Sequence, residues 1–133
     1  MILLDTHVAL WIMRGDAALG KKAREAAEGA LQKGELAISS ISFWEVALLI
    51  SKGRLRSLDD PREQRNLMIR AGVRELPLSG EIAILAAELE TLHHDPADRF
   101  IAATAIAHSA ILMTADERIL KWKHSVKRQD AEN

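Results

Sequence analysis

The chain has 133 residues, of which 48% are hydrophobic and 28% are charged, and this length and balance are typical of a single globular domain. A formal net charge of −1 excludes a uniformly polycationic nucleic-acid binder, and the absence of cysteine excludes disulfides and thiolate metal sites. No apolar run approaches the roughly 18 residues that span a membrane. We therefore expect one domain over residues 1–133, without a membrane segment, in the reducing cytoplasm.

The first half of the chain alternates short apolar runs with longer helical segments. Residues 1–4 predict a buried strand, and the spacing of apolar residues over 6–14 predicts a helix. Residues 17–33 are rich in Ala, Glu and Lys and predict a second helix, after which residues 36–38 predict a second strand. The helix expected over residues 41–52 is apolar nearly all round. This pattern predicts burial on two sides and favours a subunit interface on one of them.

The second half of the chain continues this alternation. A basic helix is expected near residues 58–71, and Pro77 confines the next strand to an edge or an end of the sheet. Ser79 is a suitable N-cap for one helix, and Pro96 suits the first turn of the next. The polar tail from Lys123 is expected to be loosely held. The other predicted elements are a strand at 73–78, a helical stripe of Ile82, Leu85, Ala86, Leu89 and Leu92, a strand at 111–113 and a short helix ending near Trp122.

Strands that alternate with helices indicate an α/β fold with a central, mostly parallel sheet of four or five short strands, flanked by helices. Acidic residues follow apolar runs or helix-start signals at four points: Asp5, Glu45, Asp98 and Asp116. In an open α/β sheet, ligands bind at the carboxyl ends of the strands, where several carboxylates would repel one another unless a divalent cation held them. Carboxylate and water ligands suit Mg²⁺ or Mn²⁺, so the sequence predicts a magnesium site.

Helix capping is an alternative interpretation of each acid. Ser42 and Glu45 have the spacing of a capping box, with Glu45 as the third helical residue. Thr114 and Glu117 have the same spacing, with Glu117 as the third helical residue, and Asp5 or Thr6 could cap the first helix. Taken one at a time, each acid is better explained by capping than by a metal site.

Two details favour a site over capping alone. Glu117 leaves Asp116 redundant as a cap, and Asp95 as an N-cap leaves Asp98 as a second acid in the same turn. Arg99 then places a cation at the positive end of a helix, where the helix dipole disfavours it. This position suggests negative charge nearby, either the acid cluster or a phosphate that Arg99 could help to bind.

Four short motifs follow one another along the chain: Asp5-Thr6-His7, Ser39-Ser40-Ile41-Ser42-Phe43-Trp44-Glu45-Val46, His94-Asp95-Pro96-Ala97-Asp98-Arg99 and Thr114-Ala115-Asp116. Together they resemble PIN-domain nucleases, especially the VapC toxins of toxin–antitoxin pairs. Each motif is weak alone, but four in this order are specific, and the resemblance extends to about Leu120. Ala97 departs from the larger apolar residue that related toxins often carry, which affects packing near the pocket more than chemistry.

This resemblance implies a PIN-like fold and an Mg²⁺-dependent endoribonuclease in which Mn²⁺ is a possible substitute. It also implies an RNA substrate, a homodimer and a small VapB-like antitoxin that neutralises the toxin. Glu45 and Asp116 would complete the metal pocket through waters or a second ion. The implied site consists of Asp5, Glu45, Asp98 and Asp116 as catalytic residues, Asp5 and Asp98 as direct metal ligands, and Thr6, Thr114 and Arg99 in support.

Two other functions are compatible with the sequence. One is a non-catalytic PIN scaffold for protein or RNA interaction. The other is a phosphatase with Asp5 as the nucleophile, although no second acid follows two residues later to act as general acid. The histidines lack the spacing of a zinc site, and the adjacent His93 and His94 could not both face one ion from a helix.

Overall fold

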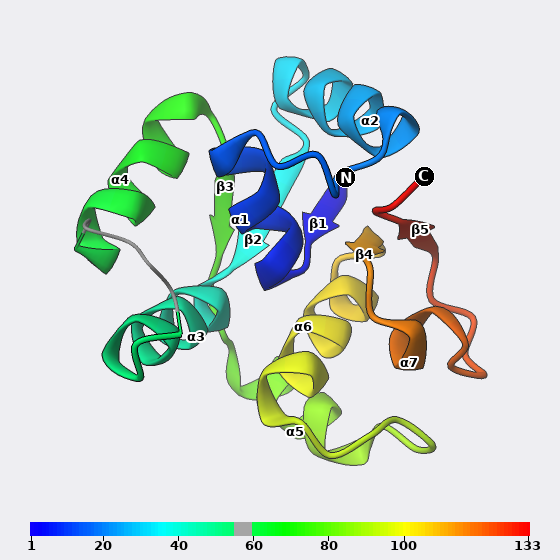
Figure 1. The fold of residues 1–133 in the computed structure, drawn as a ribbon. Coiled ribbons are helices and arrows are strands. Elements are labelled where there is room, and N and C mark those ends of the chain that lie inside the picture. Colours follow the sequence, from blue (N-terminus) through cyan, green and yellow to red (C-terminus); the bar gives the residue numbers. More distant parts are fainter. Residues whose placement is uncertain (55–59) are drawn as a thin grey trace.

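Five short strands form one central sheet in the computed structural model, which describes residues 1–54 and 60–133 (Figure 1). The order across the sheet is β3-β2-β1-β4-β5, and each of these neighbouring pairs is parallel. The predicted α/β class with a mostly parallel sheet is confirmed, and β3, which precedes Pro77, lies at an edge as expected. The strands are β1 (Ile2–Leu4), β2 (Leu36–Ser39), β3 (Arg74–Leu76), β4 (Ile111–Thr114) and β5 (Arg128–Asp130).

Seven helices lie within the described ranges, and several begin where their capping residues predicted. The Ser79 hydroxyl accepts the N–H of Ile82 and caps α5, and Asp95 caps α6 with Pro96 as its first residue. In this part of the chain, no helix is long and apolar enough to cross a bilayer. The helices are α1 (Thr6–Arg14), α2 (Lys21–Gln32), α3 (Ser40–Ser51), α4 (Pro61–Ala71), α5 (Gly80–Glu88), α6 (Pro96–Ala107) and α7 (Glu117–Leu120).

Two helix boundaries differ from those predicted. Helix α2 begins at Lys21 rather than at residue 17, after a turn that is tied to the end of the chain. Helix α5 ends at Glu88, because Leu89 adopts an extended backbone conformation. Leu89 and Leu92 of the predicted stripe therefore lie beyond the helix, although both are buried. The expected start of α4 at residue 58 lies outside the described residues.

The sheet has one hydrophobic core on each face. Leu3 in the central strand and its strand neighbours Ala37 and Leu112 point to the face that α5 and α6 cover. Ile2 and Leu4 point to the opposite face, which α1, α2 and α4 cover (Figure 1). Because successive side chains of a strand point to opposite faces, even a three-residue strand such as β1 contributes to both cores. The parallel pairing brings the carboxyl ends of the strands to the same edge of the sheet.

Helix α3 begins at the carboxyl end of β2 and packs against α4 and α6. Only Ser42 and Val46 of this helix are fully buried, and Trp44 is 50% exposed. The predicted burial on two sides is therefore not met within a single chain. The outer, apolar side of α3 leaves Trp44 free to contact another molecule.

The prediction of a loosely held tail is wrong. Residues 128–130 form β5, which pairs with β4 and extends the sheet. Ala131 is completely buried, and its carbonyl accepts the N–H of Gly20 at 2.8 Å. The carbonyl of Asn133 accepts the N–H of Lys22 at 2.8 Å. The tail is therefore joined to the sheet on one side and to the start of α2 on the other.

Gly20 and Gly29 provide a test of how firmly the tail is held. A Cβ at Gly20 would overlap the backbone of Glu132 and Asn133, whereas a Cβ at Gly29, inside α2, would meet nothing within 4 Å. We expect Gly20→Ala to lower the free energy of unfolding by about 1–3 kcal/mol through overpacking. Gly29→Ala should instead raise it by about 0.5–1 kcal/mol, because Ala is the better helix former. Urea unfolding of both variants measures the difference, and equal stabilities would contradict the docked tail.

Candidate functional site

The four predicted acids meet at the carboxyl edge of the sheet. Asp5 follows β1, Asp116 follows β4, Glu45 lies on α3 and Asp98 lies in the first turn of α6. They line one cavity of about 490 Å³. A second groove of about 360 Å³, between α1, α2 and α4, is lined by apolar residues alone and offers no ionisable group. The acidic cavity is therefore the candidate site, and its full lining is Asp5, His7, Trp11, Glu45, Asp95, Asp98, Ala115, Asp116, Arg118 and Glu132.

Asp5 is buried at the centre of this edge and has a partner for each carboxylate oxygen. Its Oδ1 accepts the backbone N–H of Thr6 at 2.8 Å, which makes it the N-cap of α1. Its Oδ2 accepts the hydroxyl of Thr114, at the end of the neighbouring strand, at 2.7 Å. Burial raises the pKa of Asp5, and these two hydrogen bonds oppose that rise. Thr6 and Thr114 therefore each hold one oxygen of the Asp5 carboxylate.

Glu45 faces the cavity from α3 and does not cap that helix. Ser39 is the N-cap, because its hydroxyl accepts the N–H of Ile41 at 3.2 Å, so Glu45 lies well past the third helical position. The predicted capping box is therefore wrong. Burial raises the pKa of Glu45, and its Oε1 is buried with no partner among the described residues. Burying an unsatisfied polar group is costly, so this oxygen is available to a ligand or a water in the cavity.

Asp98 is free for the site because Asp95 caps α6. Asp95 Oδ1 accepts the N–H groups of Ala97 at 3.1 Å and Asp98 at 3.4 Å. The Asp98 carboxylate accepts a 2.6 Å hydrogen bond from His93 Nε2 instead. Burial raises the pKa of Asp98 to about 6, the bond with His93 opposes the rise, and the charge of Asp5 adds to it.

Asp116 is itself the N-cap of α7, so the predicted capping box, with Thr114 as the N-cap and Glu117 as the third helical residue, is wrong. Its Oδ1 accepts the N–H of Arg118 at 2.8 Å, and Glu117 is the first helical residue, paired with Lys121 at 2.6 Å. The N–H of Asp116 is held by the hydroxyl of Thr114 at 3.0 Å. The Arg118 guanidinium beside Asp116 lowers the pKa of that carboxyl. One side chain therefore both caps a helix and lines the cavity.

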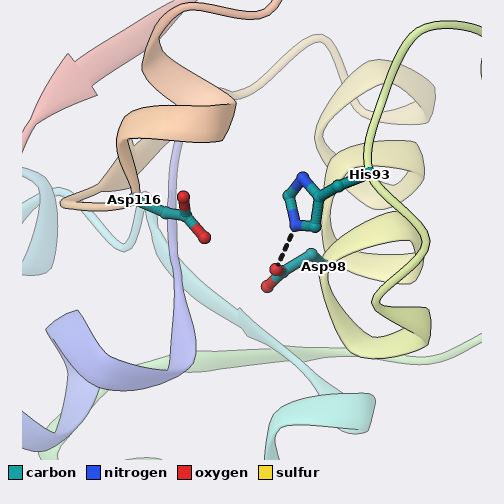
Figure 2. A group of neighbouring side chains, drawn as sticks. All are labelled: His93, Asp98 and Asp116. Atoms are coloured by element: carbon teal, nitrogen blue, oxygen red, sulfur yellow. Dashed lines mark hydrogen bonds and ion pairs between the residues drawn. The ribbon is translucent and has the colours of Figure 1, made fainter.

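Two residues of the site, His93 and Arg118, were not predicted. Figure 2 shows His93, Asp98 and Asp116 facing one another, and each offers one possible ligand atom within 4.8 Å of the other two. Arg118 Nη2 lies 2.8 Å from Asp116 Oδ2 and 3.7 Å from Asp98 Oδ2. The spacing of Arg118, two residues after a helix-capping Asp, is the one sequence signal that could have indicated its role. His93 lies in the loop before α6, where spacing carries no such signal.

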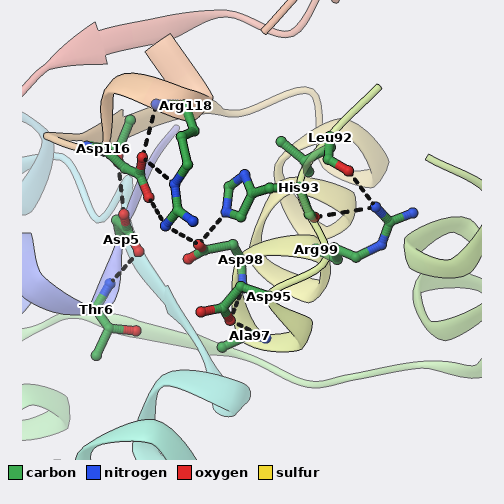
Figure 3. A network of polar contacts seen from close by, with 11 residues as sticks. Asp5, Thr6, Leu92, His93, Asp95, Ala97, Asp98, Arg99, Asp116 and Arg118 are labelled. Carbon is green, nitrogen blue, oxygen red and sulfur yellow. Dashed lines mark hydrogen bonds and ion pairs between the residues drawn. The ribbon is translucent and has the colours of Figure 1, made fainter. Parts of the chain in front are cut away.

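The predicted role of Arg99 in the acidic site is wrong. Its guanidinium points away from the cavity toward the loop that follows α5 (Figure 3). There it binds backbone carbonyls in the last turn of α5 and in the loop that follows. These acceptors explain how a cation is tolerated at the start of α6. The accepting carbonyls belong to Ala86 (3.0 Å), Ala87 (3.4 Å), Leu89 (2.6 Å), Leu92 (2.9 Å) and His93 (3.3 Å).

The electrostatics of the cavity fit a divalent cation. Desolvation raises the pKa of Asp5, Glu45 and Asp98, so each resists ionisation when no cation is bound. The ligand atoms are carboxylate oxygens, with one imidazole nitrogen close by, and this set suits Mg²⁺ or Mn²⁺. The unpaired Oε1 of Glu45 is a further oxygen available to an ion or to its waters.

Comparisons with known proteins agree with this geometry. The PIN domain family profile matches residues 2–124. The chain is 36% identical to Ribonuclease VapC22 of Mycobacterium tuberculosis (strain ATCC 25618 / H37Rv) over 124 residues, 92% of each protein. Its fold is similar to VapBC2 from Rickettsia felis bound to a DNA fragment from their promoter (TM-score 0.71, 20% identity, 97% of this chain and 98% of that one). It is also similar to FitAcB from Neisseria gonorrhoeae (TM-score 0.57, 27% identity, 87% and 88%). By sequence and by fold, the chain belongs to the PIN domain family.

Proposed function

We propose that this protein is a metal-dependent endoribonuclease and the toxin of a VapBC-type toxin–antitoxin pair. The observation that carries the proposal is the convergence of Asp5, Glu45, Asp98 and Asp116 in one cavity, from four separate segments of the chain. Capping alone does not require this, since neither Glu45 nor Asp98 caps a helix. The 36% identity to Ribonuclease VapC22 supports RNA as the substrate. We propose the cytoplasm as its place of action, in keeping with a chain that has no cysteine.

The four acids would have different roles at the metal. Asp5 and Asp98 would hold the metal directly, and Glu45 and Asp116 would complete its surroundings through water. Thr114 would fix Asp5 and the start of α7 together, since its hydroxyl bonds to both. A bound Mg²⁺ or Mn²⁺ would supply an activated water and offset charge on the phosphate being cleaved. Mg²⁺ is the ion we propose for the cell.

Sequence and structure together disfavour the two rival functions. A phosphatase with Asp5 as the nucleophile lacks a second acid two residues later to act as general acid, since His7 occupies that position. A scaffold without chemistry would not need the buried, unpaired Oε1 of Glu45. The nuclease therefore explains more of the cavity than either alternative does.

We propose a VapB-like antitoxin and a second copy of the chain as the protein partners. The VapBC complexes of similar fold support the antitoxin. The apolar outer side of α3, with Trp44 half exposed, supports a homodimer. Obligate interfaces are rich in exposed apolar and aromatic side chains of this kind.

Substitution of the acids separates metal ligands from caps. Asp5→Asn and Asp98→Asn should each reduce Mg²⁺- or Mn²⁺-dependent RNA cleavage by orders of magnitude, because each removes a ligand charge. The control is Asp60→Asn, since Asp60 caps α4 by accepting the N–H of Arg62 and does not line the cavity. Asn also caps helices well, so this variant should keep its activity. A gel assay of RNA cleavage, with an EDTA blank, measures all three, and full activity in Asp5→Asn and Asp98→Asn would refute the site.

The raised pKa of Asp98 predicts a pH-dependent stability in metal-free protein. The folded chain holds this proton up to about pH 6, whereas the unfolded chain releases it near 3.8. The free energy of unfolding should therefore fall as the pH rises from 3.8 to about 6, and it should stay at the lower value above pH 6. In Asp98→Asn, this fall in the free energy of unfolding should be smaller by on the order of 1 kcal/mol. Urea unfolding in EDTA measures the difference.

At pH 7, millimolar Mn²⁺ should stabilise the wild type, since the ion binds only the folded chain, and should do little for Asp98→Asn. If the free energy of unfolding had the same pH dependence in wild type and Asp98→Asn in EDTA, Asp98 would not hold a proton up to about pH 6.

The dimer proposal is tested by charge at the outer side of α3. Trp44→Glu should convert a dimer into a monomer, because a carboxylate buried at an apolar interface is costly. Met13→Glu is the control, since Met13 is also an exposed apolar side chain, at 37%, but lies on α1. Sedimentation velocity reports both states. A dimer that survives Trp44→Glu and not Met13→Glu would place the interface elsewhere.

A further inference from the structure

Arg118 bridges two carboxylates of the acidic cavity. Its Nη2 donates to Asp116 Oδ2 at 2.8 Å and lies 3.7 Å from Asp98 Oδ2, and its Nε donates to Asp116 Oδ1 at 3.2 Å. Figure 3 shows the guanidinium between the two acids, which come from α6 and from the start of α7. The side chain is 60% exposed, whereas those of Asp98 and Asp116 are 10% and 21% exposed. The contact therefore covers the acids from the solvent side of the cavity.

The guanidinium uses the oxygens that a divalent ion would need. One ligand atom from each of His93, Asp98 and Asp116 lies within 4.8 Å of the others, so an ion held by Asp98 would lie close to Asp116 and would use its carboxylate through water (Figure 2). Both oxygens of Asp116 already accept hydrogen bonds from Arg118. A cation held by Asp98, with its waters at Asp116, would lie close to Nη2, which is 3.7 Å from Asp98 Oδ2 and 2.8 Å from Asp116 Oδ2, and the two positive groups would repel each other.

Arg118 is also the one guanidinium that lines the cavity within the described residues. Arg99, which is close in sequence to Asp98, is bound to backbone carbonyls and does not reach the acids. Among the residues that line the cavity, Arg118 is therefore the permanently charged group that contacts the acids, beside the histidine His93 that bonds to Asp98. Because that side chain is exposed and is held by carboxylates alone, it can swing into solvent without breaking other contacts of the guanidinium.

We propose that Arg118 is the internal counter-cation of the metal-free cavity and that a divalent ion must displace it from Asp98 and Asp116 to bind. The inference rests on the proposed metal site and adds a competitor within the same chain. Its consequence is a weaker affinity for the metal and a metal-free fold that tolerates its own negative charge. Because Arg118 competes with the ion, the site should bind metal only where the divalent ion is abundant.

Arg118→Gln tests the competition, because glutamine removes the charge and keeps a polar side chain of moderate length. The matched control is Arg62→Gln: Arg62 also lies two residues after a helix-capping Asp, with its Nη1 3.4 Å from Asp60 Oδ1, and is outside the cavity. Isothermal titration calorimetry with Mn²⁺ alone, at low salt and without RNA, should give a Kd about three- to tenfold lower for Arg118→Gln than for wild type. Arg62→Gln should match the wild type.

Thermal unfolding gives a second readout that a merely structural role would not produce. In EDTA, Arg118→Gln should have a lower Tm than wild type, because the carboxylates lose their counter-charge. Saturating Mn²⁺ should close this gap, since the ion then balances the same acids.

The outcomes separate this inference from the proposed function. Tighter Mn²⁺ binding in Arg118→Gln alone, with a Tm gap that closes, supports the inference. Equal Kd values for wild type and Arg118→Gln would overturn the competition and leave the metal site intact. If neither protein binds Mn²⁺, the metal site and the competition both fail.

Discussion

Negative charge gathered at one edge of a parallel sheet is the constraint on which the other features of this site depend. The adjacent strands β1 and β4 deliver Asp5 and Asp116 to that edge, and α3 and α6 add Glu45 and Asp98. Desolvation raises the pKa of three of them, which measures how poorly the cavity tolerates their charge without help. The hydroxyl of Thr114 supplies part of that help by bonding to Asp5. A divalent cation would supply more than any hydrogen bond, which is why the cavity fits one.

Capping and metal binding are compatible roles for the same carboxylate. Asp5 and Asp116 both cap a helix that starts at the end of a strand, and both line the cavity. This follows from geometry, because an N-cap residue lies at the sheet edge with its side chain turned toward the first helical N–H groups. Helix N-termini also carry partial positive charge, which stabilises a nearby carboxylate. Glu45 and Asp98, by contrast, are not used as caps, so burial of their charge has no local structural benefit.

Two arginines show how location decides what a cation does near such a site. Arg99 lies next to Asp98 in sequence, yet its guanidinium serves carbonyls at the end of α5 and in the loop that follows. Arg118 follows α7's capping residue and reaches two acids across the cavity. Arg99 therefore stabilises the fold around the site, whereas Arg118 belongs to the charge balance inside it. Proximity in sequence to the acids predicted a site role for Arg99 and did not indicate the one that Arg118 has.

Local sequence patterns determined most of the elements and the four acids. Apolar runs predicted four of the strands, and Ser79, Asp95 and Pro96 predicted helix starts, because strand burial and helix capping depend on nearby residues. The acids were found because each follows a strand or a helix start in motifs that resemble the PIN family. Their capping assignments at Glu45 and Asp116 were wrong, since the helix register shifted by a few residues.

Only the tertiary structure decided the remaining features. Residues 128–130 are polar and carry no strand signal, yet they pair with β4, because backbone N–H and C=O groups form the ladder whatever the side chains are. His93 reaches Asp98 from a loop, and Arg118 reaches Asp98 from another element, and no spacing rule relates residues that meet only through the fold. The sequence determined which charges this protein carries to the edge of its sheet. The packing of α6 and α7 decided which side chains contact those carboxylates, since the contacts of a long, flexible side chain depend on the elements around it.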